Sequence, residues 1–366
     1  MAQWHAPTAQ TKGAHWSLGN ASKAQERETI QAARAVGYDH QELVEALAEA
    51  PREWDEAKRT GSTLANTTLR LSLPMPDAAS ALGWHEETFR VVRSDAMHPD
   101  LAARYPQISS YLILSERNAL ISGRVDLGDK GFHGIIHTPN GTVYMDPWSP
   151  GDHEQLMVYT RAEFMASTGK RRQDCDVRTM GIGKDGNASG LHELEDGRIT
   201  QRIGPPYGPT LRNYALALAC TGEYGQFHGG NVSSVLSAMN TSINRMNSIA
   251  EPELAIRLNL IPNNDLLIFL NGSTDPYTNS NGGAMLSQNQ TTVDNIIGSN
   301  NYDIGHVFST GGGGVAYLGS VCTSFKAGGV TGLPAPIGDP FNVDYVAHEM
   351  GHQFGCNHTF NNNCSG

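Results

Sequence analysis

Near the end of the chain, residues 348–358 read His348-Glu349-Met350-Gly351-His352-Gln353-Phe354-Gly355-Cys356-Asn357-His358. His348 and His352 are four positions apart, and on a helix this spacing places two imidazoles on one face. Both rings can then bind one zinc ion, each nitrogen about 2 Å from the metal. Gly355 suits a left-handed residue that ends the helix, so that the returning chain brings His358 to the same ion. The stretch therefore predicts a zinc site with these histidines as ligands.

Glu349 directly follows the first of these histidines. Three protein ligands leave a fourth zinc position for water, which is the arrangement of a catalytic zinc. We therefore predict that Glu349 is the general base that takes a proton from this water. The alternative is an ordinary helix with surface histidines. An apolar face opposite the histidines favours the zinc site over this alternative, and its residues are Val343, Val346, Ala347, Met350 and Phe354.

The quoted stretch resembles the HExxHxxGxxH motif of the metzincin zinc endopeptidases. A second stretch, residues 305–322, reads GHVFSTGGGGVAYLGSVC and is similar to the glycine-rich segment and active-site edge strand of reprolysin (adamalysin-type) enzymes. The span from about residue 210 to residue 366 therefore looks like a bacterial reprolysin-like metalloprotease. The first half of the chain resembles the propeptide that such enzymes carry.

The resemblance implies an α+β or α/β zincin-type catalytic domain, preceded by a β-rich prodomain. Its sheet would be twisted and mostly parallel, with one antiparallel edge strand and two long helices. It also implies a secreted zinc endopeptidase that is made as a zymogen and cleaves protein or peptide substrates. An extended substrate would add to the edge strand as a further strand. The residues of that strand would be Val315, Ala316, Tyr317, Leu318 and Gly319.

Metzincins carry a methionine turn after the third histidine. Because only eight residues follow His358, we expect the catalytic domain to lack its C-terminal part.

Composition divides the chain into two parts. It has 366 residues, which suggests two or three domains. Residues 206–366 hold only 4 of the 26 basic and 10 of the 37 acidic residues. The breakers in GPPYGP, residues 204–209, are typical of a linker. We therefore expect a propeptide-like domain over residues 1–205 and the catalytic domain over residues 206–366.

Hydrophobic periodicity predicts the elements of each part. The first part should begin with a helical stretch at about 24–59 and end in a polar connector at 165–203. Between them we expect strands at 69–73, 89–92, 111–114, 119–127, 131–137, 141–145 and 155–159. In the second part we expect strands at 214–220, 256–260, 265–270, 304–309 and 315–322. Helices should begin at Asn231, include residues 293–297, and cover about 340–354.

Charge and hydropathy exclude several classes of partner. The formal net charge is −11, which argues against nucleic acid as the main partner. No apolar run is long enough to span a bilayer. The first residues lack the apolar stretch of a signal peptide, so a secreted location rests on the family resemblance alone. The sequence leaves the oligomeric state open.

The chain has five cysteines: Cys175, Cys220, Cys322, Cys356 and Cys364. In a chain with an odd number of cysteines, at least one is free, bound to metal or paired outside the chain. Cys175 lies in the expected pro-segment, and a thiolate is a good zinc ligand. Propeptides of several metzincin branches use such a cysteine switch, so Cys175 is a candidate for one; a free cysteine is the alternative. We expect the propeptide to be cut between Lys170 and Tyr207.

Other interpretations of the zinc site remain open at this point. Three histidines with the thiolate of Cys356 or Cys364 would form a closed structural site, as in a non-catalytic, zinc-stabilised adhesion or binding module. Another metzincin branch, such as a pappalysin-like enzyme, is the alternative within the enzymes. Asp275 in STDPYTNSNGG is a candidate calcium ligand, although an ordinary polar loop explains the same residues.

Overall fold

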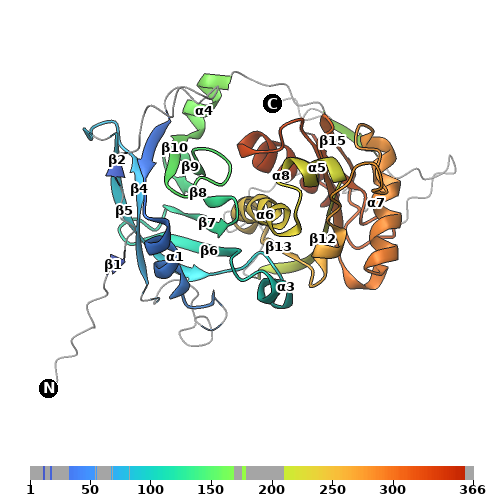
Figure 1. The fold of residues 1–366 in the computed structure, drawn as a ribbon, viewed down its shortest axis with the longest axis horizontal. Coiled ribbons are helices and arrows are strands. Elements are labelled where there is room, and N and C mark those ends of the chain that lie inside the picture. Colours follow the sequence, from blue (N-terminus) through green and yellow to red (C-terminus); the bar gives the residue numbers. More distant parts are fainter. Residues whose placement is uncertain are drawn as a thin grey trace, which may run out of the picture. The chain divides into compact units, whose positions relative to one another are not determined.

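The computed structural model describes residues 11–12, 17–18, 33–53, 55, 67, 69–81, 83–168, 175–178 and 210–358. The chain forms two compact units (Figure 1). Unit 1 contains residues 1–172 together with 228–248, and unit 2 contains residues 173–227 together with 249–366. The boundary that composition predicts, at 205/206, lies outside the described residues and stays a prediction. Residues 228–248 follow the connector in sequence, yet they pack with unit 1.

Unit 1 is built on a ten-stranded sheet. In chain order its strands are β1 (Thr11–Lys12), β2 (Ser17–Leu18), β3 (Arg34–Gly37), β4 (Arg70–Pro76), β5 (Trp84–Arg93), β6 (Ser109–Ser115), β7 (Ser122–Gly128), β8 (Gly131–Thr138), β9 (Gly141–Pro147) and β10 (Gln155–Thr160). From β4 to β10, each strand pairs antiparallel with the next in sequence. The seven strands expected between residues 69 and 159 are confirmed.

The expected helical stretch at 24–59 is only partly helical where it is described. Helix α1 (His40–Ala48) begins at Asp39, whose carboxylate accepts a hydrogen bond from the backbone N–H of Glu42. Residues 34–37 instead form β3, which pairs with β10. Helical propensity is overridden there because strand pairing satisfies the backbone and buries Val36. Unit 1 also contains the shorter helices α3 (Pro99–Arg104) and α4 (Arg161–Thr168).

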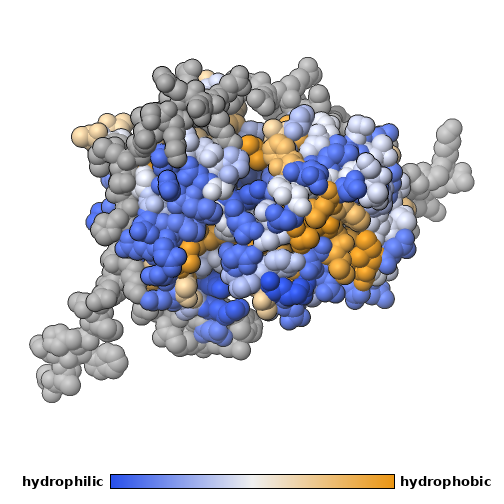
Figure 2. Space-filling view, viewed as in Figure 1, coloured by the Kyte–Doolittle hydropathy of each residue, from blue (hydrophilic) through white to orange (hydrophobic). Residues whose placement is uncertain are grey.

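One face of the unit 1 sheet carries its apolar core. Leu43 and Leu47 of α1 pack with side chains that alternate along the strands. These are mainly Leu71, Leu73, Phe89, Val91, Tyr111, Ile113, Val125, Leu127, Phe132, Ile136, Val143, Met145, Leu156 and Val158. Burial of these side chains leaves a mostly hydrophilic surface in the view of Figure 2.

Unit 2 holds a six-stranded sheet in the order β11-β15-β16-β14-β12-β13. Its strands are β11 (Cys175–Arg178), β12 (Arg212–Cys220), β13 (Ile256–Leu260), β14 (Ile304–Ser309), β15 (Gly313–Tyr317) and β16 (Gly329–Gly332). The pair β15/β16 is antiparallel, and the other pairs are parallel. The described strands therefore form a mostly parallel sheet in which β15 runs opposite to its neighbour β16.

The helices described after residue 210 are α5 (Gly222–Phe227), α6 (Val232–Leu254), α7 (Gly282–Ile296) and α8 (Val346–Gln353). A π-helical turn, Pro340–Tyr345, leads into α8. The strand expected at 265–270 is wrong, because Asn264–Leu267 is a 3₁₀ turn. The buried Asn264 side chain hydrogen-bonds the backbone N–H and C=O of Leu218, which fixes this turn against β12.

Strand β15 differs from the expected edge strand in two ways. It ends at Tyr317, so Leu318 and Gly319 lie in the turn beyond it, where Gly319 has a φ of +66°. It is also not at the edge of the described sheet. Residues 175–178 of the connector add parallel to it as β11. A sequence pattern cannot reveal this pairing, because the two segments are far apart in the chain.

Candidate metal centre and active site

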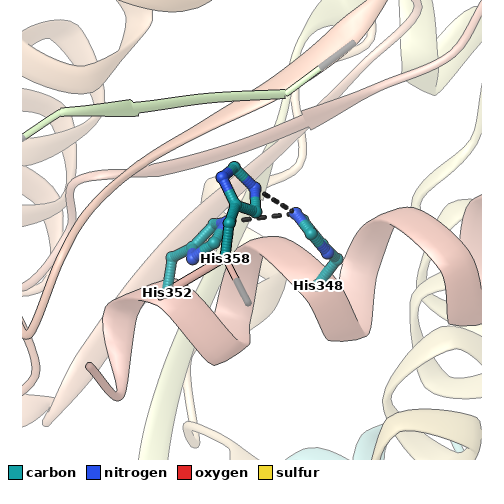
Figure 3. Close-up of side chains that lie close together, drawn as sticks. All are labelled: His348, His352 and His358. Atoms are coloured by element: carbon teal, nitrogen blue, oxygen red, sulfur yellow. Dashed lines mark hydrogen bonds between the residues drawn. The ribbon is translucent and has the colours of Figure 1, made fainter. Parts of the chain in front are cut away.

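The three histidines of the quoted stretch converge on one point. The Nε2 atom of His348 lies 3.0 Å from Nε2 of His352 and 3.0 Å from Nε2 of His358. One nitrogen from each ring lies within 4.8 Å of the others, as a shared metal ion requires. In Figure 3 two of the rings rise from α8, and the His358 ring, which comes from beyond the helix, joins them. The predicted convergence is confirmed.

Gly355 makes the chain reversal that returns His358 to the helix. Its φ is +94°, a conformation that favours glycine. Its N–H donates to the carbonyl of His352, and the N–H of Cys356 donates to the carbonyl of Gly351. These bonds end the helix in the manner of a glycine cap. The predicted left-handed helix end is confirmed.

Hydrogen bonding and burial prepare the rings to bind a metal. The Nδ1 atom of His352 lies 2.6 Å from the backbone carbonyl of Cys356. It must donate there, so its Nε2 lone pair faces the cluster. Burial, and then the neighbouring His352 and His358 rings, lower the pKa of His348 to about 4. Burial also lowers the pKa of His352. Neutral imidazole is the metal-binding form, so the cluster fits a zinc ion.

Glu349 lies against strand β15. Its side chain is fully buried. A Cβ atom added to Gly314 would lie only 2.2 Å from Oε1 of Glu349. A glycine at 314 is therefore what allows the carboxylate to approach the strand beside the histidine cluster. The sequence shows a run of four glycines at 311–314, but it does not show which of them meets Glu349.

A buried hydrogen-bond chain holds α8 to the unit 2 sheet. Nδ1 of His306 is 2.8 Å from Oε1 of Gln353, and its Nε2 is 2.8 Å from the hydroxyl of Thr331. The Gln353 amide donates to the carbonyl of Gly305, so its Oε1 accepts from His306. Burial lowers the pKa of His306 to about 4, so the ring is neutral and accepts from Thr331. Sequence reasoning missed Gln353, whose only signal was its place beside His352.

The other candidates from the sequence lie elsewhere. Cys356 is exposed and free, and the only candidate metal group among the described residues consists of histidines alone. Cys364 lies outside the described residues. The carboxylate of Asp275 accepts from the N–H groups of Gly222 and Tyr277, 2.5 Å and 2.8 Å away. These contacts give Asp275 a role in loop structure.

Comparison with known proteins agrees with this geometry. Residues 236–359 match the family described as metallo-peptidase family M12B, reprolysin-like. This segment is therefore similar to reprolysin-like metallopeptidase domains. The chain is also similar to human disintegrin and metalloproteinase domain-containing protein 9, with 26% identity over 239 residues. That match covers 64% of the chain and 28% of the relative, so the chain spans about a quarter of the relative's length.

A solved structure, metalloproteinase-II from Bacteroides fragilis, matches with 9% identity and a TM-score of 0.44. The match covers 85% of this chain and 87% of that one. Among the residues that the structure describes, none of the helices is both apolar and long enough to cross a bilayer.

Proposed function

We propose that the protein is a zinc-dependent endopeptidase. The observation that carries this proposal is the convergence of three histidine nitrogens beside the buried Glu349, within a segment of reprolysin-like type. His348, His352 and His358 would hold the ion. The open fourth position would distinguish this site from a structural zinc site, which has four protein ligands.

The residues of the chain have separate roles in the proposed reaction. Zinc would supply Lewis acidity toward both the water and the scissile carbonyl. Glu349 takes a proton from the water while the oxygen of the water forms a bond to the carbonyl carbon. It then gives this proton to the amine nitrogen as the C–N bond breaks. The products are a new carboxyl group and a new amine, and Glu349 returns to its starting state.

Strand β15 is the proposed site of substrate binding. Its backbone at Val315, Ala316 and Tyr317 would pair with an extended peptide, which supports cleavage of protein or peptide substrates. In this structure residues 175–178 pair with the same strand. A short extended segment therefore fits this position, and substrate and connector would compete for it.

This competition supports synthesis as a zymogen. The strand register pairs Cys175 with Gly314, where an added Cβ would lie 2.2 Å from Oε1 of Glu349. This backbone register supports the proposal that Cys175 serves as a cysteine switch. We infer that a cut between Lys170 and Tyr207 frees the site. Secretion of the enzyme is part of the same proposal and rests on the resemblance to reprolysin-like enzymes.

Replacing Glu349 tests the function directly. In the processed enzyme, Glu349→Gln should lower the rate of peptide cleavage by about 10²–10⁴-fold, because general base catalysis is lost. Zinc content, measured by atomic emission, should stay at one ion per chain. Glu253→Gln, an exposed change on α6, is the matched control and should leave the rate unchanged. A wild-type enzyme that holds zinc but cleaves no peptide would instead indicate a zinc-stabilised binding module.

A further inference from the structure

Helix α6 carries a polar face that the unit 1 sheet covers. Its residues recur every three or four positions, which places them along one side of the helix. They are Ser233, Ser237, Asn240, Thr241, Asn244, Arg245 and Ser248. Apart from Ser233, all are buried, although a polar helix face normally meets solvent. Something other than water must therefore satisfy these side chains.

The partners come from the face of the sheet opposite its apolar core. Ser110 of β6, Asp126 of β7 and His133 of β8 lie side by side in register. Their neighbours Tyr111, Val125 and Phe132 point to the other face and belong to the apolar core. The sheet thus presents a row of polar side chains across adjacent strands, and α6 lies beside β7 in Figure 1.

Asp126 is the centre of the contact. It is 2% exposed and accepts two hydrogen bonds from α6. The Thr241 hydroxyl donates over 2.6 Å, and the Asn244 amide donates over 3.0 Å. Oδ1 of Asn244 accepts in turn from the guanidinium of Arg124, 3.0 Å away. One strand and one helix therefore share a continuous buried network.

A second charged contact lies one helical turn further along. Arg245 donates to Asp146 of β9 over 2.6 Å, and its side chain is 1% exposed. Nearer the start of the helix, a Cβ on Gly128 would lie 2.2 Å from the Ser237 hydroxyl. The helix and the strand therefore approach closely, and this closeness needs a glycine.

The chemistry of this contact fits two surfaces that can separate. Each side, once uncovered, shows hydroxyl, amide and charged groups that water can solvate. An apolar contact would instead expose hydrophobic surface on separation and favour aggregation. The ion pair between Arg245 and Asp146 gives specificity, since removing one partner takes away the opposite charge that the other faces.

We propose that the polar face of α6 is a dissociable docking surface for residues 1–172, which stay bound to it as a separate polypeptide after the connector is cut. The proposal concerns what holds the two pieces together, and it does not depend on catalysis. Removal of residues 1–172 would then take two steps. The connector is cut first, and the unit 1 strands dissociate from α6 afterwards.

The experiment uses the full chain with a specific protease site inserted between residues 172 and 173, so that β11 stays with unit 2. Glu349→Gln is present in every variant, so the result is the same whether or not the protein is a peptidase. After the cut, the two pieces should elute together in size-exclusion chromatography at micromolar concentration. A labelled N-terminal piece, residues 1–172, is prepared from protein that has been cut and separated. The rate and extent to which it replaces the unlabelled piece in the complex then give the dissociation constant.

Two variants remove single contacts of the docking surface. Thr241→Val keeps the shape of the side chain but removes the hydroxyl that donates to Asp126, and it should raise the dissociation constant about 10-fold. Arg245→Met should raise it about 30-fold or more. When Asp146→Asn is combined with Arg245→Met, the fold-increase in the dissociation constant should be smaller than the product of the fold-increases of the two single variants.

Matched controls remove the same groups elsewhere. Thr292→Val deletes a hydroxyl from a buried position on α7, and Arg257→Met deletes a guanidinium that pairs with Glu251. Neither should change the dissociation constant more than about 2-fold, because neither residue belongs to the polar face of α6. Pieces that separate at micromolar concentration with their circular dichroism intact would overturn the proposal. Equal effects of Arg245→Met and Arg257→Met would overturn it as well.

Discussion

The side chain of Gln353 lies 2.8 Å from the ring of His306, and this hydrogen bond connects the histidine-bearing helix to the strand behind it. Gln353 follows His352 directly in sequence, so it leaves the helix on a different side from the metal cluster. A Cβ on Gly329 would lie 2.2 Å from Oε1 of Gln353, which shows how closely the sheet approaches this amide. The orientation of the helix therefore depends on a buried polar contact as well as on apolar packing.

Gln353→Leu should destabilise the protein by about 2–4 kcal/mol. The change leaves the N–H of His306 and the carbonyl of Gly305 buried without their partner, and each such group costs free energy. Urea denaturation followed by circular dichroism measures this loss. Gln288→Leu is the control: it removes an amide whose bonds to Thr278 are exposed, and it should change stability by less than about 0.5 kcal/mol. Similar losses in both variants would contradict the role given to Gln353.

His306 should make stability fall on mild acidification. Burial lowers its pKa in the folded protein to about 4, whereas an unfolded histidine titrates near about 6.5. Between these values the unfolded chain binds more protons, so the free energy of unfolding falls as the pH drops from 6.5 to 4. The contribution is about 3 kcal/mol, and it is fully present above pH 6.5. Urea titrations of wild type and His306→Asn at constant zinc should show a smaller loss for the variant; equal losses would refute the assignment.

Periodicity was enough to predict the elements that bury one face. The unit 1 strands alternate apolar and polar residues, and α6 has apolar residues at helical spacing, so both were found from sequence. The metal cluster was predictable for a similar reason. The i, i+4 spacing of His348 and His352 and the glycine at 355 lie within one short stretch of the chain, so the sequence alone shows them.

Features that depend on distant pairing could not be predicted in this way. Strand β16 reads Gly-Val-Thr-Gly and has no alternation of its own, and it exists because β14 and β15 pair with it. Strand β11 lies in a polar connector for which sequence indicated no strand. The polar side of α6 would ordinarily be interpreted as solvent-exposed. Its burial follows only from the row of polar side chains on the unit 1 sheet.

Gly314→Ala should impair catalysis, whereas Gly312→Ala should not. The added methyl group would lie 2.2 Å from Oε1 of Glu349, so the carboxylate must move. A general base that is displaced by about 1 Å loses about 100-fold in kcat/KM. At Gly312 a Cβ meets nothing within 4 Å, so Gly312→Ala is the matched control. Peptide-cleavage rates of the two processed variants decide the matter, and equal rates would show that the contact at 314 has no catalytic effect.

His358→Ala should weaken zinc binding about 100-fold or more, because one of three ligands is lost. Competition with a chelating dye at neutral pH measures the affinity. His85→Ala serves as the control, since this ring is about half exposed in unit 1 and lies outside the cluster. The zinc affinity of His358→Ala should be clearly lower than that of His85→Ala. If His358→Ala binds zinc as tightly as His85→Ala, the ion has another set of ligands.

Cys175→Ala should produce a precursor that cleaves peptides before any processing. The register places Cys175 opposite Gly314 and so at the level of Glu349 along β15. A thiolate there would take the position of the water, and without it only the β11 pairing remains to exclude substrate. We therefore expect activity of the uncut variant, measured on a short fluorogenic peptide, to be at least about 10-fold above the uncut wild type. Cys322→Ala, at an exposed cysteine of unit 2, should leave the precursor latent. A silent Cys175→Ala precursor that becomes active once cut would mean that residues 175–178 block the site by strand pairing alone.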